Sequence, residues 1–288
     1  MIRPLRMLAA ALPLLLFQAC ATRKAVEQPL PELEPIDIAE QPRNTQAERE
    51  FWEAIAGASV IYVAERHDDD ATHEYQFELI RTMRSRGYPF AIGWEMFETD
   101  SEPLLRQWQE RQISTDELLQ KVNWQKSWGG YSRMYEQMLR WAHSAKVKCI
   151  ALNAPRSMSR KLVSRQPLTP EERQLLPTGF EAPPDGYENF LEQMAGHPGS
   201  KGQDLRPYYE AQQLWEQTMA QQITDYLAKN PGSKLVVFLG RGHASDNYGV
   251  PFYVRQRGKP KQVILAPGDP LEGKKLQLAQ AKESVPLS

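Results

Sequence analysis

The sequence has little cysteine: Cys20 and Cys149 are the two in a chain of 288 residues. Cys20 directly follows an apolar N-terminal segment, so Cys149 has no second thiol in the rest of the chain with which to pair. This excludes a disulfide framework and a metal site built from cysteines. The motif C-x-x-C-H is absent too, which excludes a covalently attached c-type haem.

Clusters of positive charge are also missing. The 35 lysines and arginines nearly balance the 36 aspartates and glutamates, the formal net charge is -1, and no long basic block occurs. No nucleic-acid partner is therefore expected. The sequence has no G-x-S-x-G nucleophile elbow, which argues against a standard serine hydrolase. Its LGRGH segment lacks the Lys-Ser/Thr that completes a phosphate-binding loop.

The first twenty residues, MIRPLRMLAAALPLLLFQAC, have the layout of a bacterial signal peptide, with two arginines, an apolar core and a small residue before Cys20. The apolar core is too short to span a membrane comfortably. A cysteine directly after the cleavage position predicts a signal peptide over residues 1–19 and lipidation of Cys20. A proline-rich, flexible tether is expected over residues 20–43. Secretion with cleavage at another position is the alternative.

Ala21 bears on where such a lipoprotein would reside. By resemblance to bacterial lipoproteins, a residue other than aspartate after the lipidated cysteine points to the outer membrane rather than to retention at the inner membrane. We therefore expect an outer-membrane protein that faces the periplasm and is held by acyl chains, such as palmitate, on Cys20.

Two kinds of apolar segment alternate between residues 44 and 267. Apolar residues at helical spacing predict helices, as at residues 45–57 and 70–86, and short runs rich in β-branched and aromatic residues predict strands. The predicted strands are SVIYVA, FAIGWEMF, VKCIALN and KLVVFLG, with FYVRQR and QVILA as two more at an edge. This alternation predicts an α/β fold with a mostly parallel central sheet flanked by helices. Residues 102–230 are expected to carry a helical insertion, and residues 268–288 a flexible tail.

Polar side chains follow three of the predicted strands. Glu65 and His67 follow the first, Glu95 follows the core of the second, and His243 follows KLVVFLG. Because the carboxyl ends of parallel strands meet at one edge of a sheet, these side chains are expected to share a crevice. His73, which begins the next helix, would lean toward the same edge.

This set of residues has three interpretations. Imidazoles with carboxylates can bind a divalent metal, through His67, His73, Glu95 and His243, or they can perform acid–base chemistry in which a carboxylate orients a histidine. Alternatively, such groups are solvated or cap helices. Residues 68–70, all aspartate, are expected to do the latter at the start of the following helix.

A long helix predicted over residues 206–229 contains two adjacent tyrosines. Tyr208 lies near the start of the apolar stripe of this helix, whereas Tyr209 shares the less apolar side with Gln213 and Glu216. A tyrosine phenolate is a hard anionic ligand for ferric haem iron. Tyr209 is the preferred candidate, and Tyr208 remains open. His197, in the glycine-rich segment before this helix, could support an iron ligand on its own chain or on a neighbour.

Several motifs together resemble the ChaN family of haem-binding lipoproteins, a branch of the wider group that includes the Tiki and TraB proteins and the erythromycin esterases. They are AERHDD, GWEMF, NWQKSWGGY, ALNAPR, YYEAQQLWEQTMA, and LGRGH followed by GVPFYV. The resemblance runs from about residue 50 to residue 254 and implies an erythromycin-esterase-like and ChaN-like fold.

The resemblance also implies a function. Members bind haem non-covalently, as a b-type cofactor, through a tyrosine and an assisting histidine from a second subunit, with two haems stacked in a homodimer. On this chain, the matching residues are Tyr209 for the iron ligand and His197 for the assisting histidine. An outer-membrane haem receptor is the partner expected for haem or iron uptake.

Two further functions stay open for the strand-end residues. A metal-dependent or histidine-based hydrolase, similar to the Tiki-like proteases or the erythromycin esterases, would use Glu65, His67, Glu95 and His243. The same residues could instead form a structural hydrogen-bond network. Neither alternative conflicts with haem binding at Tyr209.

Overall fold

The computed structural model of the chain describes residues 46–195, 202–245 and 248–267. The predicted signal peptide, the lipidation site Cys20, the tether, the C-terminal tail and His197 lie outside the described residues. No helix within the described ranges is long and apolar enough to cross a membrane.

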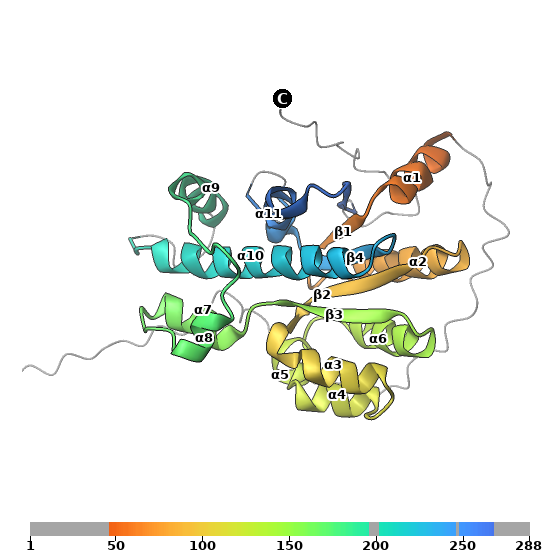
Figure 1. Cartoon of the computed structure of the whole chain (residues 1–288), viewed down its shortest axis with the longest axis horizontal. Helices are drawn as coiled ribbons and strands as arrows, with labels where there is room; N and C mark the ends of the chain where they lie inside the picture. The colour runs from red at the N-terminus through yellow and green to blue at the C-terminus, as the bar shows by residue number, and fades with distance from the viewer. Residues whose placement is uncertain (1–45, 196–201, 246–247, 268–288) are drawn as a thin grey trace, which may run out of the picture.

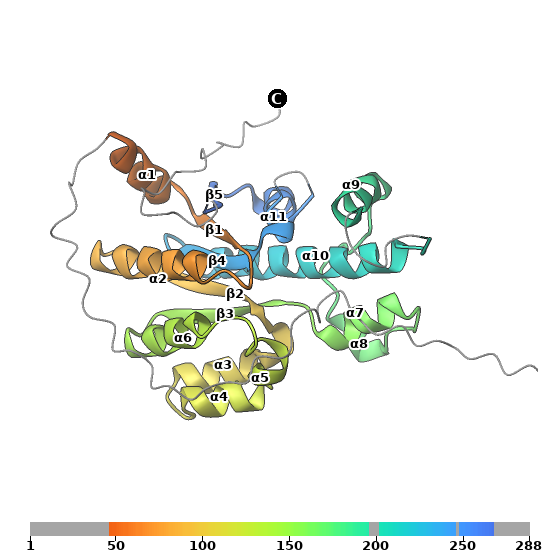
Figure 2. The same ribbon diagram turned by 180° about the vertical axis from the view of Figure 1, so that it is seen from behind.

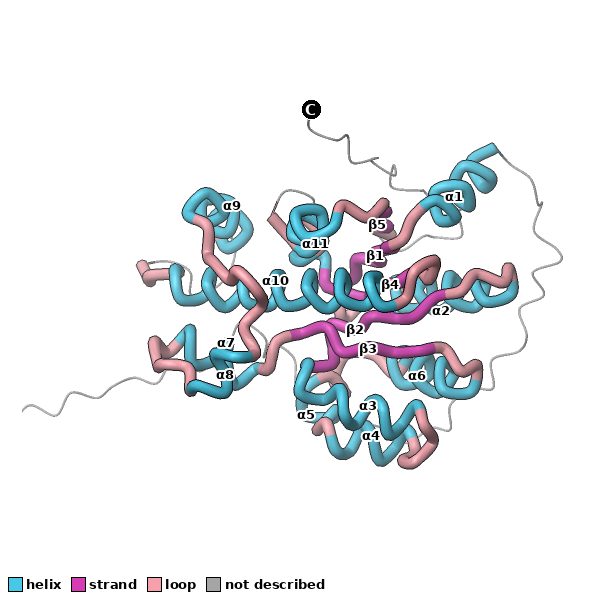
Figure 3. Tube along the Cα trace, viewed as in Figure 1, coloured by secondary structure: helices cyan, strands magenta, loops and turns pink. Residues whose placement is uncertain are grey.

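Five strands form one sheet at the centre of the molecule (Figure 1, Figure 3). They are β1 (Val60–Glu65), β2 (Phe90–Glu98), β3 (Lys148–Asn153), β4 (Lys234–Gly240) and β5 (Gln262–Leu265). Their order is β3-β2-β4-β1-β5, and every neighbouring pair is parallel. The predicted α/β fold with a mostly parallel sheet is therefore confirmed. β4 lies between β1 and β2, so the three strands that carry the candidate site are neighbours.

Side chains alternate between the two faces of the sheet, as expected for strands, and both faces are buried. On β4, Val236 and Phe238 pack into one core, while Leu235, Val237 and Leu239 pack into the other. The first core is covered by α1 (Gln46–Gly57), α2 (Asp70–Ser85), α3 (Glu102–Gln109), α4 (Thr115–Lys121), α5 (Trp124–Ser127) and α6 (Met134–Ser144). The second is covered by α10 (Arg206–Lys229) and α11 (Val250–Gly258) (Figure 1, Figure 2). The result is a three-layer arrangement.

The helix-rich region at residues 102–230 forms two connections between strands, one that precedes β3 in the sequence and one that follows it. The first, from β2 to β3, begins with a short 3-10 turn, Thr99–Ser101, and contains α3 to α6. The second, from β3 to β4, contains α7 (Arg156–Val163), α8 (Pro170–Gln174), α9 (Pro184–Met194) and α10. In Figure 1, α7, α8 and α9 lie beside the half of α10 that extends beyond the sheet.

One predicted strand is a helix. FYVRQR, expected at an edge of the sheet, lies in α11, whereas QVILA does form the edge strand β5. Pro251 occupies the first turn of α11, where its missing N–H costs no hydrogen bond. Val250 and Val254, one helical turn apart, are both buried against the second core. Packing against α10 therefore overrides the strand preference of this β-branched and aromatic segment.

The helix starts agree better with the sequence. Two of the aspartates at residues 68–70 form the start of α2, as predicted: Asp70 is its first residue, and the Asp69 side chain caps the helix by accepting a hydrogen bond of 3.2 Å from the backbone N–H of Ala71. This cap fixes the turn between β1 and α2, which carries His67, and the first turns of α2, which carry His73.

Candidate functional site

The ends of β1, β2 and β4 bring the predicted carboxylates and imidazoles together. Glu65 is the last residue of β1, Glu95 lies on β2 within the register shift between Trp94 and Glu98, and His243 ends the 3-10 turn Arg241–His243 that follows β4. His67 lies two residues beyond β1. The shared edge of a parallel sheet thus assembles all four side chains, as the order of the strands requires.

Glu65 and His67 form the tightest pair of the cluster. Nδ1 of His67 lies 2.8 Å from Oε1 of the buried Glu65 carboxylate. The Gln76 side-chain amide and the Tyr135 hydroxyl also donate hydrogen bonds to this carboxylate. Nε2 of His73 is 3.7 Å from the second carboxylate oxygen. Glu65 therefore fixes the orientation of the His67 ring and leaves Nε2 of His67 facing the crevice.

Burial alone would raise the pKa of the Glu65 carboxyl, but its contacts with His67 and His73 outweigh that effect. Hydrogen bonds and coulombic attraction from the two imidazoles lower the pKa from 4.5 to about 2. For His67, burial lowers the pKa, while the hydrogen bond to Glu65 and the charge of Glu95 raise it above its usual value. The pair therefore favours an imidazolium beside a carboxylate.

Glu95 connects His67 to His243. Its Oε1 atom lies 4.0 Å from Nε2 of His67 and 3.6 Å from Nε2 of His243, and its Oε2 atom accepts a 2.5 Å hydrogen bond from the backbone N–H of Gly240. A Cβ atom at Gly240 would lie 3.0 Å from Nε2 of His67. The glycine of LGRGH therefore permits the close approach of the β4 backbone to the His67 ring.

A fifth member, Glu216 on α10, was not predicted. Its Oε1 atom lies 3.5 Å from Nδ1 of His243 and accepts a 2.8 Å hydrogen bond from the Gln212 side-chain amide. Burial raises the pKa of Glu216, and contact with His243 opposes this effect. For His243, burial lowers the pKa, but Glu95 and Glu216 together raise it to about 8. Carboxylate and imidazole thus alternate in the order Glu65, His67, Glu95, His243 and Glu216.

Solvent reaches this alternating row mainly at His67. Its side chain is 18% exposed, whereas the side chain of Glu65 is completely buried. The His67 ring makes edge contacts with Trp128 and Tyr131, at 5.1 and 5.7 Å between ring centroids, and the Arg156 guanidinium lies 5.3 Å from the Trp128 ring. The imidazole that Glu65 orients is therefore the member of the row best placed to meet a small molecule.

The geometry does not support the alternative divalent-metal site at His67, His73, Glu95 and His243. Within the described parts of the chain, no group of three or more His, Cys, Asp or Glu side chains is arranged to hold a metal ion. His73 is completely buried on the far side of Glu65, 3.7 Å from its carboxylate. His67 and His243 face the same oxygen of Glu95, so the nitrogens that would bind a metal are directed at carboxylates instead.

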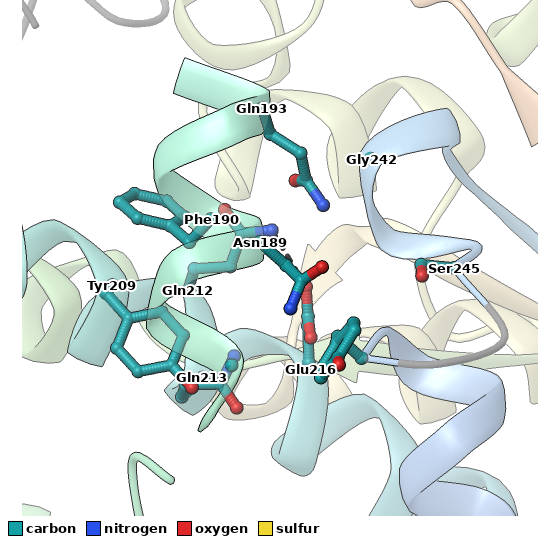
Figure 4. A pocket seen from close by; sticks show the side chains of 11 residues that line it. Asn189, Phe190, Gln193, Tyr209, Gln212, Gln213, Glu216, Gly242 and Ser245 are labelled. Atoms are coloured by element: carbon teal, nitrogen blue, oxygen red, sulfur yellow. Dashed lines mark hydrogen bonds between the residues drawn. The ribbon is translucent and has the colours of Figure 1, made fainter. Parts of the chain in front are cut away.

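Tyr209 is buried, which corrects the expectation of solvent exposure that its place on the less apolar side of the long helix raises. Its ring packs against Phe190 of α9, at 5.6 Å between centroids (Figure 4), and against Tyr187 of the same helix, at 5.5 Å. Its hydroxyl donates a 2.6 Å hydrogen bond to the Pro183 carbonyl. Burial, with the nearby charges of Glu216 and other acidic groups, raises the pKa of Tyr209 to about 12. The neighbouring Tyr208 is partly exposed.

The cause of this difference is α9, a helix that the sequence patterns did not predict. α9 lies over the side of α10 that carries Tyr209 and Gln213 (Figure 1, Figure 4). Gly186 of α9 makes the close contact possible, because a Cβ atom at that position would collide with the Tyr209 hydroxyl. The prolines at the start of α9 are a local signal that could have indicated this helix.

A small cavity separates α9 from α10 and the turn after β4. It is lined by Asn189, Phe190, Tyr209, Glu216 and Gly242, among others (Figure 4). Its volume of about 10 Å³ is room for a single water, whereas pockets for small molecules and cofactors typically measure about 300–1,000 Å³. A phenol among aromatic rings suits ferric haem, but this closed arrangement leaves no room for a porphyrin.

Known proteins share the sequence pattern and the fold. The chain matches the family model described as "Haem-binding uptake, Tiki superfamily, ChaN" over residues 51–254. No curated protein sequence matches it. A solved structure that shows cofacial haem binding to ChaN of Campylobacter jejuni is similar to this protein. The TM-score is 0.57 and the sequence identity 20%, over 79% of this chain and 89% of that one. At this identity, the similarity shows the fold.

Weaker similarities extend to toxins and an esterase. The RRSP effector domain of a MARTX toxin from Vibrio vulnificus CMCP6 has a TM-score of 0.47 and 12% identity, over 77% of this chain and 36% of that one. An H289N mutant of the erythromycin esterase EreC in its open conformation has a TM-score of 0.44 and 14% identity, over 82% of this chain and 79% of that one. Neither is similar enough to carry a functional argument.

Proposed function

Because the chain belongs to the ChaN family of haem-binding uptake proteins in the Tiki superfamily, we propose that it binds haem non-covalently and takes part in haem or iron uptake. The observation that carries this proposal is the family match over residues 51–254. The fold similarity to a ChaN protein that binds haem cofacially supports it.

Tyr209 is the proposed ligand of the haem iron. It is held among aromatic rings, Tyr187 and Phe190 of α9. Among the described residues that line the adjacent cavity, none is a histidine or cysteine that would compete for the iron. When bound, the haem would supply a ferric centre, and the role of Tyr209 would be to provide a hard anionic oxygen.

A hemin titration tests this assignment. The purified wild-type protein should shift the Soret band of hemin with saturable binding, and Tyr209→Phe should abolish the tyrosinate signature while leaving the fold intact. Tyr208→Phe is the matched control, because it removes the neighbouring, partly exposed hydroxyl. An unchanged titration for Tyr209→Phe, with loss of the signal for Tyr208→Phe, would transfer the role to Tyr208.

A homodimer that encloses two stacked haems is part of the same proposal. His197 from a second subunit would assist the iron ligand, as the family resemblance implies. Light scattering during the titration should report a monomer without hemin and twice that mass at saturation. His197→Ala should weaken dimer formation more than it weakens binding of the first haem. A mass that stays constant across the titration would contradict the dimer.

We further propose that Cys20 anchors the protein to the outer membrane, where it faces the periplasm and serves an outer-membrane haem receptor. The arrangement of apolar and small residues before Cys20 supports this location. Cys20→Ser should prevent labelling with radioactive palmitate and release the protein from the outer-membrane fraction. Unchanged labelling and fractionation would contradict lipidation at this residue.

A second candidate function is a histidine-dependent hydrolase at the row of carboxylates and imidazoles. The observation that favours it is the 2.8 Å contact between Glu65 and Nδ1 of His67, which orients the partly exposed His67 imidazole for proton transfer to or from a small molecule. Turnover of small esters or peptides that disappears in His67→Gln, while hemin binding persists, would support this function. If wild type shows no turnover and His67→Gln only loses stability, the row is a structural network.

A further inference from the structure

The helix α9 holds the proposed iron ligand in a closed state. The Tyr209 hydroxyl, which would have to face the iron, instead donates its hydrogen bond to the Pro183 carbonyl at the start of α9. The ring lies beneath Tyr187 and Phe190 of the same helix. With only about 10 Å³ of cavity beside it, Tyr209 cannot contact a ligand larger than water until α9 moves.

The packing beneath α9 is separate from the main cores of the protein. Phe190, Leu205 and Tyr209 form a small cluster of their own, apart from the two clusters that cover the sheet. The side of α9 that faces the cavity also carries polar side chains, Asn189 and Gln193 (Figure 4). A helix with few buried apolar contacts is the kind of element that opens locally without global unfolding.

The segment just before α9 is, in contrast, tied to α10. The backbone N–H of Glu181 donates to the Gln217 side chain at 3.3 Å, and the Gln217 amide donates to the Glu181 carbonyl at 2.5 Å. The backbone N–H of Thr178 donates to the Gln221 side chain at 2.7 Å. These hydrogen bonds hold the chain to α10 as far as Glu181. Beyond Glu181, the hydrogen bond from Tyr209 to the Pro183 carbonyl is a tie that opening would break, and residues 182–184 are the place where α9 can turn relative to α10.

We propose that α9 is a lid that masks Tyr209, and that haem binds only after α9 swings away from α10 about residues 182–184. Opening breaks the hydrogen bond between Tyr209 and Pro183, exposes the phenol, and joins the small cavity to the space that α9 vacates. This inference rests on the proposed haem-binding function. Because the open state is a fraction of the population, the apparent affinity for haem is reduced by that fraction.

The test uses a loosened lid and a matched control on the same helix. Phe190→Ala removes a buried ring that packs on Tyr209, whereas Leu191→Ala shortens an exposed side chain of α9 and leaves the contact with α10 in place. Gly186→Ala is a second, independent opening variant, because the new Cβ atom collides with the Tyr209 hydroxyl. Circular dichroism establishes that each variant is folded.

Two measurements are made on each full-length protein. Nitration of Tyr209 by tetranitromethane, located by mass spectrometry, reports lid opening without haem, with the partly exposed Tyr208 as an internal reference. Stopped-flow measurement of the Soret change reports the rate of hemin binding. Phe190→Ala and Gly186→Ala should both increase the nitration of Tyr209 and bind hemin about tenfold faster or more, while Leu191→Ala should match wild type.

The outcomes separate failure of the lid from failure of haem binding. If Tyr209 is nitrated as readily as Tyr208 in wild type, or if the opening variants bind hemin no faster, the lid is overturned while haem binding stands. If no protein binds hemin, yet the opening variants still expose Tyr209, the proposed function fails and the role of α9 in haem binding fails with it.

Discussion

The buried carboxylate of Glu65 is expected to be one of the most important single side chains for stability. We consider its replacement by glutamine, which preserves its size but removes its charge. In the folded protein this carboxylate accepts hydrogen bonds from His67, Gln76 and Tyr135 and lies 3.7 Å from Nε2 of His73. Glutamine would present an amide N–H₂ to donors and would leave the imidazoles without their anion.

The magnitude follows from the pKa. Each tenfold change in proton affinity is worth about 1.4 kcal/mol, so a fall in the pKa of Glu65 from 4.5 to about 2 stabilises the folded protein by about 3 kcal/mol at neutral pH. Because the folded-state pKa is lowered, this stabilisation is complete above pH 4.5 and is lost as the pH falls through 2. Breaking a buried ion pair by removing one partner costs a similar amount, about 3–5 kcal/mol.

Urea unfolding followed by circular dichroism measures the effect. Glu65→Gln should lower the free energy of unfolding by about 3 kcal/mol at pH 7, and the difference from wild type should shrink to about 1 kcal/mol at pH 3. Glu78→Gln, an exposed carboxylate on α2, is the control and should change stability by less than about 0.5 kcal/mol. A deficit for Glu65→Gln that is the same at both pH values would refute the electrostatic reasoning.

Three further stability predictions follow from the same structure. The pKa of His243 rises from 6.5 to about 8, which corresponds to about 2 kcal/mol of stability that is complete below pH 6.5 and should be lost as the pH rises through 8. The urea midpoint of wild type should therefore fall between pH 6 and pH 9, and the midpoint of His243→Gln should fall less. Tyr135→Phe removes a donor to the buried carboxylate that ends β1 and should cost about 1.5–3 kcal/mol in urea unfolding. Gly93→Ala places a Cβ atom 2.8 Å from the Leu152 side chain and should cost about 1–3 kcal/mol in thermal unfolding, whereas Gly130→Ala meets no atom within 4 Å and should cost far less.

The sheet and most of the candidate site could be predicted because they depend on short-range patterns. Runs of β-branched and aromatic residues mark β1 to β4, and the helices between them require parallel pairing. Once the strands are parallel, their carboxyl ends share one edge, so the meeting of Glu65, Glu95 and His243 follows from topology. That prediction requires no knowledge of side-chain packing.

The remaining site residues could not be predicted because they depend on contacts between distant segments. Tyr135 is separated by 70 residues from the carboxylate to which it donates, and no local pattern signals such a contact. Helical spacing places Tyr209 and Glu216 on one side of α10, where both line the same cavity, but it does not indicate that α9 covers that side. A polar helix face indicates solvent only when no other element covers it.

The structure also changes the relation between the two candidate sites. Sequence patterns place the strand-end residues and Tyr209 in different parts of the chain, yet Glu216 belongs to both: it pairs with His243 at 3.5 Å, and it lines the cavity beside Tyr209. Its charge also contributes to the raised pKa of Tyr209. A substitution at Glu216 would therefore disturb the row of carboxylates and imidazoles and the proposed iron ligand together. Tyr209 and His67, which do not share a contact, are the residues whose replacement can separate haem binding from hydrolysis.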